Sequence, residues 1–168
     1  MRRYLLVPSV CGLLFGLALR QRFVVVTVDG DSMWPTLKPG DRVLVRRARL
    51  VSICAGQIVV IEAPGIDGAW ATRSRGSPES REWIIKRVAG VPGDPRPADC
   101  LPDAAGPLEQ HVPARKLVVI GDNPSWSQDS RQWGYFPGER LLGVVVRRIR
   151  AHSSRTRADG APGGAWMG

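Results

Sequence analysis

The sequence predicts an all-β fold, a mostly antiparallel folded sheet or barrel, with one apolar segment at the N-terminus. Short β-branched runs recur along the chain between turn residues. Glycine occurs 19 times and proline 14 times in 168 residues. No long amphipathic helical pattern follows residue 22. Many short strands with regular turn signals are typical of folded sheets and barrels.

The N-terminal run from Tyr4 to Leu19 carries no charge, and arginines flank it on both sides. It is somewhat shorter than the roughly 20 residues of a spanning helix, but flanking arginines can reach the membrane surface. A cleavable signal peptide or a buried core helix are the alternatives. Because no small-x-small cleavage site follows the run, we expect residues 1–22 to form one transmembrane helix, an uncleaved single-pass anchor.

The side of the membrane that holds the domain is not settled by charge. Positive residues are denser after the apolar run than before it, which by the positive-inside rule favours the cytoplasm. A long folded domain, however, can translocate regardless of its charge. Both orientations stay open on charge alone.

Six segments after the apolar run have the composition of strands. β-branched residues dominate them, and glycine, proline or aspartate bounds most of them. Residues 65–81 lack the hydrophobic periodicity of a helix or strand, so we expect an exposed loop there. Several prolines exclude a helix over residues 91–107. We expect one domain over residues 23–150 and a disordered tail over 151–168. The predicted strands are 22–30, 42–47, 56–64, 82–90, 116–123 and 139–150.

The formal net charge is +9 and the pI about 10.7, which indicates a solvated basic surface or, more specifically, an anionic membrane surface or nucleic acid as a partner. Nucleic acid is not expected, because no basic helix or zinc pattern accompanies the charge. The three cysteines have no CxxC spacing, so no metal or other cofactor is implied. A disulfide between Cys54 and Cys100 is an open alternative.

Ser32 lies just after a predicted strand, with Gly30 before it and Pro35 after it. A serine on such a constrained loop can present its hydroxyl together with its own backbone N–H. Acyl transfer needs both an attacking oxygen and a donor to the oxyanion. Most serines in such turns only bond the backbone, so Ser32 needs a base before it indicates catalysis.

Lysine is the better candidate for that base. His111 and His152 lie in a proline-rich stretch and in the tail, without supporting residues. Lys86 lies among apolar residues in WIIKRV, where alternation can turn it inward and burial can lower its pKa. A solvent-facing Lys86 on an edge strand is the alternative.

Four ordered motifs resemble those of type I signal peptidases, a family of membrane-bound Ser–Lys endopeptidases. Residues 31–37 (DSMWPTL) resemble the nucleophile motif, and 38–45 (KPGDRVLV) the strand after it. Residues 86–94 (KRVAGVPGD) resemble the motif of the base, and 121–134 (GDNPSWSQDSRQWG) the last motif. The resemblance covers roughly residues 20–150.

The resemblance implies a role for each matching position. Ser32 is the nucleophile, Lys86 the base, and Ser127 the hydroxyl that orients the lysine. Asp129 and Arg131 form a structural ion pair, while Gly121, Asp122 and Asn123 shape a turn. Gly30, Asp31 and Met33 contact the substrate. Some members carry a serine where Gly30 stands, so a second oxyanion donor has no assigned residue.

By the same resemblance, the chain removes signal or leader peptides from precursor proteins at the plasma membrane. The domain then lies on the extracytoplasmic face in contact with lipid, and the substrate adds as a strand beside residues 22–30. The oligomeric state stays open. The short chain also suits a maturation protease dedicated to a single precursor. A non-catalytic peptide-binding domain is another alternative, whereas a self-cleaving repressor lacks its DNA-binding helices here.

Overall fold

A computed structural model of the chain describes residues 21–65, 70, 82–102 and 110–149. The predicted anchor over 1–22, apart from its last two residues, and the predicted tail over 151–168 lie outside these described residues. So does most of the predicted loop over 65–81. Within the described ranges, no helix is both long and apolar enough to cross a membrane.

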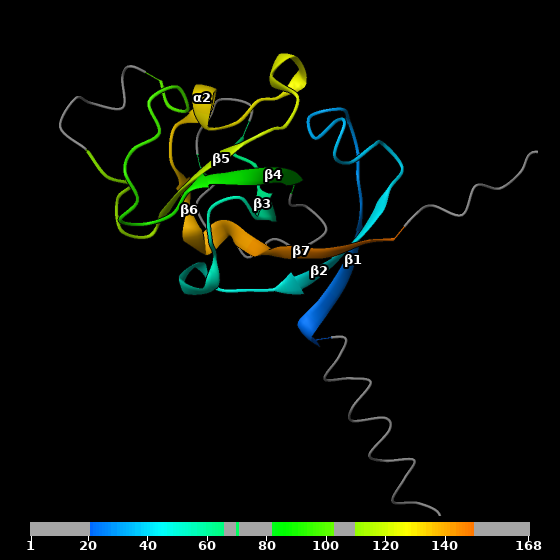
Figure 1. Cartoon of the computed structure of the whole chain (residues 1–168). Coiled ribbons are helices and arrows are strands. Elements are labelled where there is room, and N and C mark those ends of the chain that lie inside the picture. The colour runs from blue at the N-terminus through cyan, green and yellow to red at the C-terminus, as the bar shows by residue number, and fades with distance from the viewer. Residues whose placement is uncertain (1–20, 66–69, 71–81, 103–109, 150–168) are drawn as a thin grey trace, which may run out of the picture.

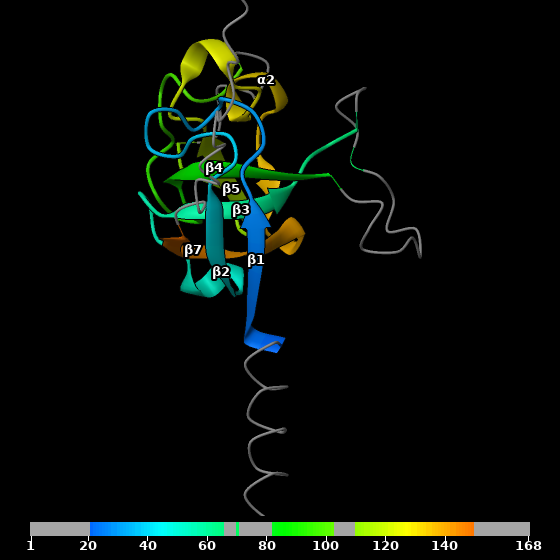
Figure 2. The ribbon, with the colours of Figure 1, turned by 90° about the vertical axis from the view of Figure 1, so that its right-hand side faces the viewer.

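The described residues form a seven-stranded sheet in the order β1-β2-β7-β3-β4-β5-β6. Every paired strand is antiparallel, so the mostly antiparallel all-β prediction is confirmed. Figures 1 and 2 show that the sheet curls, with β1 and β2 running across the direction of β3 and β4. The strands are β1 (Phe23–Thr27), β2 (Arg42–Arg47), β3 (Ile58–Glu62), β4 (Trp83–Gly90), β5 (Lys116–Ile120), β6 (Phe136–Pro137) and β7 (Leu141–Ile149).

The last strand along the chain, β7, lies inside the sheet between β2 and β3. Its register with both neighbours shifts once, and Gly143 lies where an added Cβ would come within 2.2 Å of the Arg46 carbonyl oxygen. Since only glycine allows this approach, Gly143 permits the close packing of β7 on β2. β7 therefore joins the half of the sheet that carries β1 to the half that carries β4.

The core consists of two main clusters that share β3. Val59 and Ile61 of β3 belong to one cluster, and Val60 between them belongs to the other. Successive residues of a strand point to opposite faces, so β3 is covered on both of its faces. The second cluster also includes Met33 and Leu37, which fastens the loop after β1 to the core.

The structure adds one helix that the sequence did not predict and decides one alternative that the sequence left open. A short helix, α2 (Ser130–Trp133), begins at a capping box formed by Asp129 and Gln132. The four-residue helix is too short for a periodic pattern to reveal it. The Cys54–Cys100 disulfide is absent, because both cysteines are free thiols. Three short 3-10 turns complete the described part: η1 (Leu50–Ser52), η4 (Pro124–Trp126) and η5 (Gly138–Arg140).

Candidate active site

Ser32 lies on a loop that leaves β1 and returns to β2. Two backbone hydrogen bonds close its base, from Val28 N to Asp41 O at 2.8 Å and from Gly40 N to Val28 O at 2.9 Å. Met33 is 1% exposed, whereas Ser32 is half-buried and Asp31 is exposed. Gly30 has a φ of +73°, a left-handed conformation that favours glycine. The buried methionine therefore anchors a loop whose serine stays accessible.

Lys86 lies in the middle of β4, opposite Val59 of β3, and only 3% of it is exposed. Burial disfavours the ammonium form and lowers the pKa of Lys86 from 10.5 to about 8. The charge of Asp129 opposes this shift and that of Arg131 supports it. A lysine with this pKa is partly neutral near pH 8 and can accept a proton from a hydroxyl.

Ser127 connects Lys86 to Asp129. The Lys86 Nζ atom donates a hydrogen bond to Ser127 Oγ at 2.9 Å. The Ser127 hydroxyl in turn donates to Asp129 Oδ2 at 2.6 Å. Ser127 follows η4 and is 7% exposed, so both hydrogen bonds lie inside the protein.

Asp129 is fully buried, and Gly121, Ser127 and Arg131 donate hydrogen bonds to its carboxylate. Gly121 N–H donates to Oδ2 at 2.8 Å beside the Ser127 hydroxyl. Arg131 donates from Nε at 2.9 Å, from Nη2 at 2.7 Å and from its backbone N–H at 3.2 Å. Burial alone would raise the pKa of Asp129, but these hydrogen bonds outweigh it and lower the pKa. Asp129 is therefore an anion fixed beside the lysine.

Gly121 sits where the serine loop meets the Ser127 segment. A Cβ atom at Gly121 would lie 2.2 Å from Ser127 Oγ and 2.6 Å from the Ser32 carbonyl oxygen. The same carbonyl accepts a hydrogen bond from Asn123 N at 3.0 Å, and Asn123 Nδ2 donates to the Asp31 carbonyl at 3.1 Å. Gly121 therefore packs closely on both the Ser32 carbonyl and the side chain of Ser127, which is the hydrogen-bond partner of Lys86.

Asp122 is bound by Arg87, the residue of β4 that follows Lys86 and points to the opposite face of the strand. Arg87 Nε and Nη2 donate to the two carboxylate oxygens of Asp122, each at 2.7 Å. Arg87 Nη1 also donates to Gly56 O at 2.8 Å. The hydrogen bonds from Arg87 keep the pKa of Asp122 below its ordinary value. Sequence reasoning gave Arg87 no role, although its place beside Lys86 in an alternating strand put it on the opposite face.

A small cavity of about 190 Å³ adjoins Ser32. Residues 27–29 at the end of β1 form one wall and residues 82–85 at the start of β4 form another. Ser32 and Met33 complete the lining, whereas Gly30 and Asp31 lie beside it and not in it. Two strand ends with a hollow between them suit an extended peptide with a small side chain.

The structure thus brings Lys86, Ser127, Asp129 and Arg131 into one connected network. Ser32 lies beside this network, with its carbonyl oxygen accepting from Asn123 N, and none of the hydrogen bonds of the described residues links its side chain to Lys86. Within the same ranges, no group of three or more histidine, cysteine, aspartate or glutamate side chains could hold a metal ion.

The chain was compared with known proteins. The sequence model of the family described as signal peptidase, peptidase S26, matches residues 2–95 and 98–149. A probable signal peptidase I-2 of Synechocystis is 31% identical over 140 residues, which is 73% of this chain and 61% of that protein. A signal peptidase I of Leptolyngbya laminosa is 29% identical over 145 residues, covering 73% of this chain and 66% of the relative.

A third relative comes from a eukaryote. The mitochondrial inner membrane protease subunit 1 of Schizosaccharomyces pombe is 29% identical over 136 residues, covering 77% of this chain and 75% of that protein. The chain spans less than two thirds of the length of the first two relatives. The family match covers the loop of Ser32, the strand of Lys86 and the Ser127 segment alike. The chain belongs to the signal peptidase family, peptidase S26.

Proposed function

We propose that the chain is a membrane-bound serine endopeptidase that removes signal or leader peptides from precursor proteins. Ser32 is the nucleophile and Lys86 the general base. The observation that carries this proposal is the buried amine of Lys86, which donates to Ser127 Oγ, together with the close approach of both Ser127 Oγ and the Ser32 carbonyl oxygen to Gly121. Family membership and the names of the relatives support the same activity.

The hydrogen bonds give the Lys86 amine a direction. Since the Ser127 hydroxyl donates to Asp129, its oxygen is free to accept from Lys86. A neutral amine that donates one N–H to Ser127 keeps its lone pair for another proton. That lone pair takes the proton of the Ser32 hydroxyl as the serine oxygen attacks the scissile carbonyl.

The protonated Lys86 then gives its proton to the leaving amine, and an acyl-enzyme on Ser32 remains. Lys86, neutral again, takes a proton from the water that attacks this ester and returns it to the Ser32 oxygen as the ester bond breaks. The backbone N–H of Ser32 is the one oxyanion donor assigned here, because Gly30 has no hydroxyl to add. Gly30, Asp31 and Met33 stay the proposed substrate contacts, with Met33 reaching the cavity beside Ser32.

The charges of Asp129 and Arg131 act in opposite directions on the pKa of Lys86, the proposed base. The Asp129 charge favours the ammonium form of Lys86 and raises its pKa, whereas the Arg131 charge lowers it. Burial is the largest influence on the pKa of Lys86, and the charge of Arg131, paired with Asp129 at 2.7 Å, opposes that of Asp129. Asp129 can therefore hold Ser127 in place without keeping Lys86 protonated.

The substrate enters as an extended segment. β1 is the end strand of the sheet order, so one of its edges is free to accept another strand. The cavity of about 190 Å³ at the end of β1 has room for a small side chain next to the scissile bond. We further propose residues 1–22 as the membrane anchor, 23–150 as the catalytic domain, and the extracytoplasmic face as its location.

Cleavage of a panel of precursors by detergent-solubilised protein tests this function. Wild type is compared with Ser32→Ala and Lys86→Ala, with the exposed residues Ser125→Ala and Lys38→Ala as matched controls. We expect wild type and controls to cut precursors with small residues before the cleavage site, and both active-site variants to be inactive. Turnover by either active-site variant would refute its assigned role.

The same panel separates the alternatives. Cleavage of one precursor alone would identify a dedicated maturation protease with the same mechanism. If wild type binds precursor peptides and releases them uncut, the chain is an anchored peptide-binding domain and the proposal fails.

A further inference from the structure

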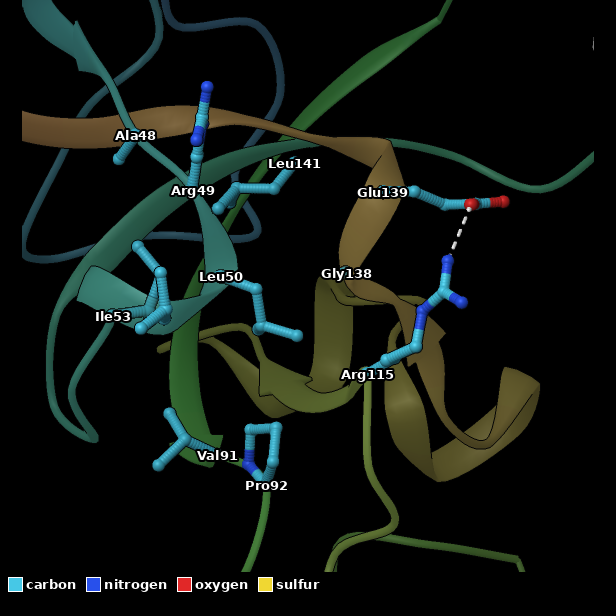
Figure 3. A pocket seen from close by; sticks show the side chains of 11 residues that line it. Ala48, Arg49, Leu50, Ile53, Val91, Pro92, Arg115, Gly138, Glu139 and Leu141 are labelled. Carbon is cyan, nitrogen blue, oxygen red and sulfur yellow. Dashed lines mark ion pairs between the residues drawn. The ribbon is translucent and has the colours of Figure 1, made fainter.

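A second cavity, of about 760 Å³, lies away from the Ser32 loop. Its apolar lining includes Leu50, Ile53, Pro92 and Leu141, which Figure 3 shows facing a common space. Residues 48–53 supply one side, and Arg115, Gly138 and Glu139 supply the other. None of the residues assigned to catalysis lines this cavity.

One wall of the cavity, at Ala48, directly follows the strand that pairs with the start of β1. Phe23, the first residue of β1, pairs with Arg46, and the cavity wall starts two residues later at Ala48. Figures 1 and 2 show η1 at the same end as the start of β1. The Ser32 loop follows the opposite end of β1. In the sequence, the uncharged run from Tyr4 to Leu19 precedes Phe23 by only a few residues.

Exposed arginines surround the opening. Arg49 lines the cavity, and Figure 3 shows its guanidinium pointing away from the apolar side chains. Arg115 lines it from the other side, with 83% of its side chain exposed. Glu139 is the one carboxylate of the lining and pairs with Arg115 at 3.5 Å, an exposed contact that contributes little stability. Arg22, Arg46 and Arg47 are further exposed arginines near the start of β1.

The backbone holds Arg115 in place. Its φ is +66°, a left-handed conformation that is uncommon outside glycine, and its carbonyl accepts a hydrogen bond from Gly138 N at 2.8 Å. Val51, also in the lining and two residues after Arg49, is 90% exposed. Apolar side chains between arginines match the interface of a membrane, where acyl chains lie below anionic headgroups.

We propose that this cavity binds an acidic glycerophospholipid of the membrane. The phosphate lies between Arg49 and Arg115, and the first part of an acyl chain packs on Leu50, Val51 and Leu141. Lipid is favoured over other anions because the lining is mainly apolar and because its wall at Ala48 follows β2, whose end pairs with the start of β1, just after the proposed membrane anchor. The inference rests on the proposed membrane setting but not on catalysis.

The full chain in single-copy lipid nanodiscs tests the proposal. Backbone hydrogen exchange over residues 48–53 is compared in discs of phosphatidylcholine alone and in discs that also contain phosphatidylglycerol. The test variant is Arg49→Gln with Arg115→Gln. The control is Arg42→Gln with Arg147→Gln, two exposed arginines outside this lining that remove the same charge.

We expect phosphatidylglycerol to slow exchange over residues 48–53 in wild type and in the control. The test variant should lose this protection, or need on the order of tenfold more acidic lipid to reach it. Equal exchange in both lipid mixtures would overturn the proposal, and so would equal protection in the control and test variants. Protection by inorganic phosphate without lipid would show a simple anion site, and protection only with two copies per disc would show a self-interface. Either result would also overturn it, and precursor cleavage in the same discs reports separately on the proposed function.

Discussion

The Lys86 amine and the Ser127 hydroxyl meet at 2.9 Å, although 41 positions of sequence separate them. β4 supplies the amine, and the segment after η4 supplies the hydroxyl. Ser127 is the bridge between the proposed base and the fixed charge of Asp129.

The pH dependence of cleavage should report the buried lysine. Lys86 acts as a base only when neutral, and its pKa is about 8. We therefore expect kcat/KM for a precursor peptide to rise with pH and to reach half of its plateau near pH 8. A midpoint near 6.5, the ordinary pKa of histidine, would assign the base to a different residue.

Removing the Ser127 hydroxyl should misdirect the base without unfolding the protein. In Ser127→Ala, the Lys86 amine loses its acceptor, and we expect kcat to fall on the order of a hundredfold while KM changes little. Ser125→Ala removes an exposed hydroxyl two residues away and should keep full activity. Steady-state kinetics with one peptide measures both. An unchanged kcat in Ser127→Ala would show that Ser127 does not orient Lys86 for catalysis.

Lys86→Met should abolish catalysis. It should also remove the free-energy cost of deprotonating Lys86 or burying its charge when the protein folds. The pKa of Lys86 falls from 10.5 when unfolded to about 8 when folded, so the unfolded chain binds more protons between these values. The cost is complete below about pH 8 and disappears as the pH rises past 10.5. We expect Lys86→Met to be at least as stable as wild type at neutral pH, with its relative advantage shrinking in alkali.

Urea unfolding of wild type and Lys86→Met across this pH range measures the effect. Lys38→Met, at an exposed lysine, serves as the control and should show a constant difference from wild type. A constant difference for Lys86→Met as well would mean that burial does not perturb this amine.

Gly121→Ala should disrupt the junction between the serine loop and Ser127. The new methyl group would lie 2.2 Å from Ser127 Oγ and 2.6 Å from the Ser32 carbonyl oxygen. We expect a loss of about 1–3 kcal/mol of stability and most of the activity, because both segments must move apart. Gly40→Ala meets no atom within 4 Å but has a φ of +84°. It should cost about 1–2 kcal/mol through the backbone alone and keep activity. Equal activity in the two variants would contradict this account.

Asp129→Asn should destabilise the protein in a pH-dependent way. The variant leaves Arg131 without its buried carboxylate, and we expect a loss of about 3 kcal/mol at neutral pH. The folded pKa of Asp129 is lowered, so its contribution is full above the ordinary pKa of aspartate. This contribution disappears as the pH falls through the folded pKa.

Denaturant unfolding at neutral and acid pH checks this prediction. Asp99→Asn changes an exposed carboxylate and should remain close to wild type at both. A difference between Asp129→Asn and wild type that persists undiminished in acid would show that the carboxylate is not stabilising as an anion.

The local pattern of β-branched and turn residues was enough to predict most strands. It could not predict the order of the strands in the sheet. The runs that became β2 and β4 stand out because β-branched and apolar residues gather between turn residues. That β7 would enter between β2 and β3 depends on contacts distant in sequence, which no local period encodes. The helix α2 was missed because its only signal is the capping box of Asp129.

The candidate site was predicted in part and for a different reason. From its neighbours in the sequence, Lys86 could face either the interior or the solvent. The family resemblance favoured the interior. The hydrogen bonds of Ser127 follow from how the chain folds back on β4, so sequence spacing cannot supply them. The pair of Arg87 with Asp122 was not predicted, because an arginine in a basic chain carries no signal of its partner.

The place of β7 in the sheet determines when the site can exist during synthesis. The ribosome makes the Ser32 loop early and the Lys86 strand later, yet these halves join in the sheet only through β7, Leu141–Ile149. Contacts between distant segments form late, because the intervening chain must first be made and closed. A nascent chain that lacks β7 therefore carries the proposed nucleophile and the proposed base without the sheet that connects them. We expect the proposed activity only once the last strand has been made and has paired.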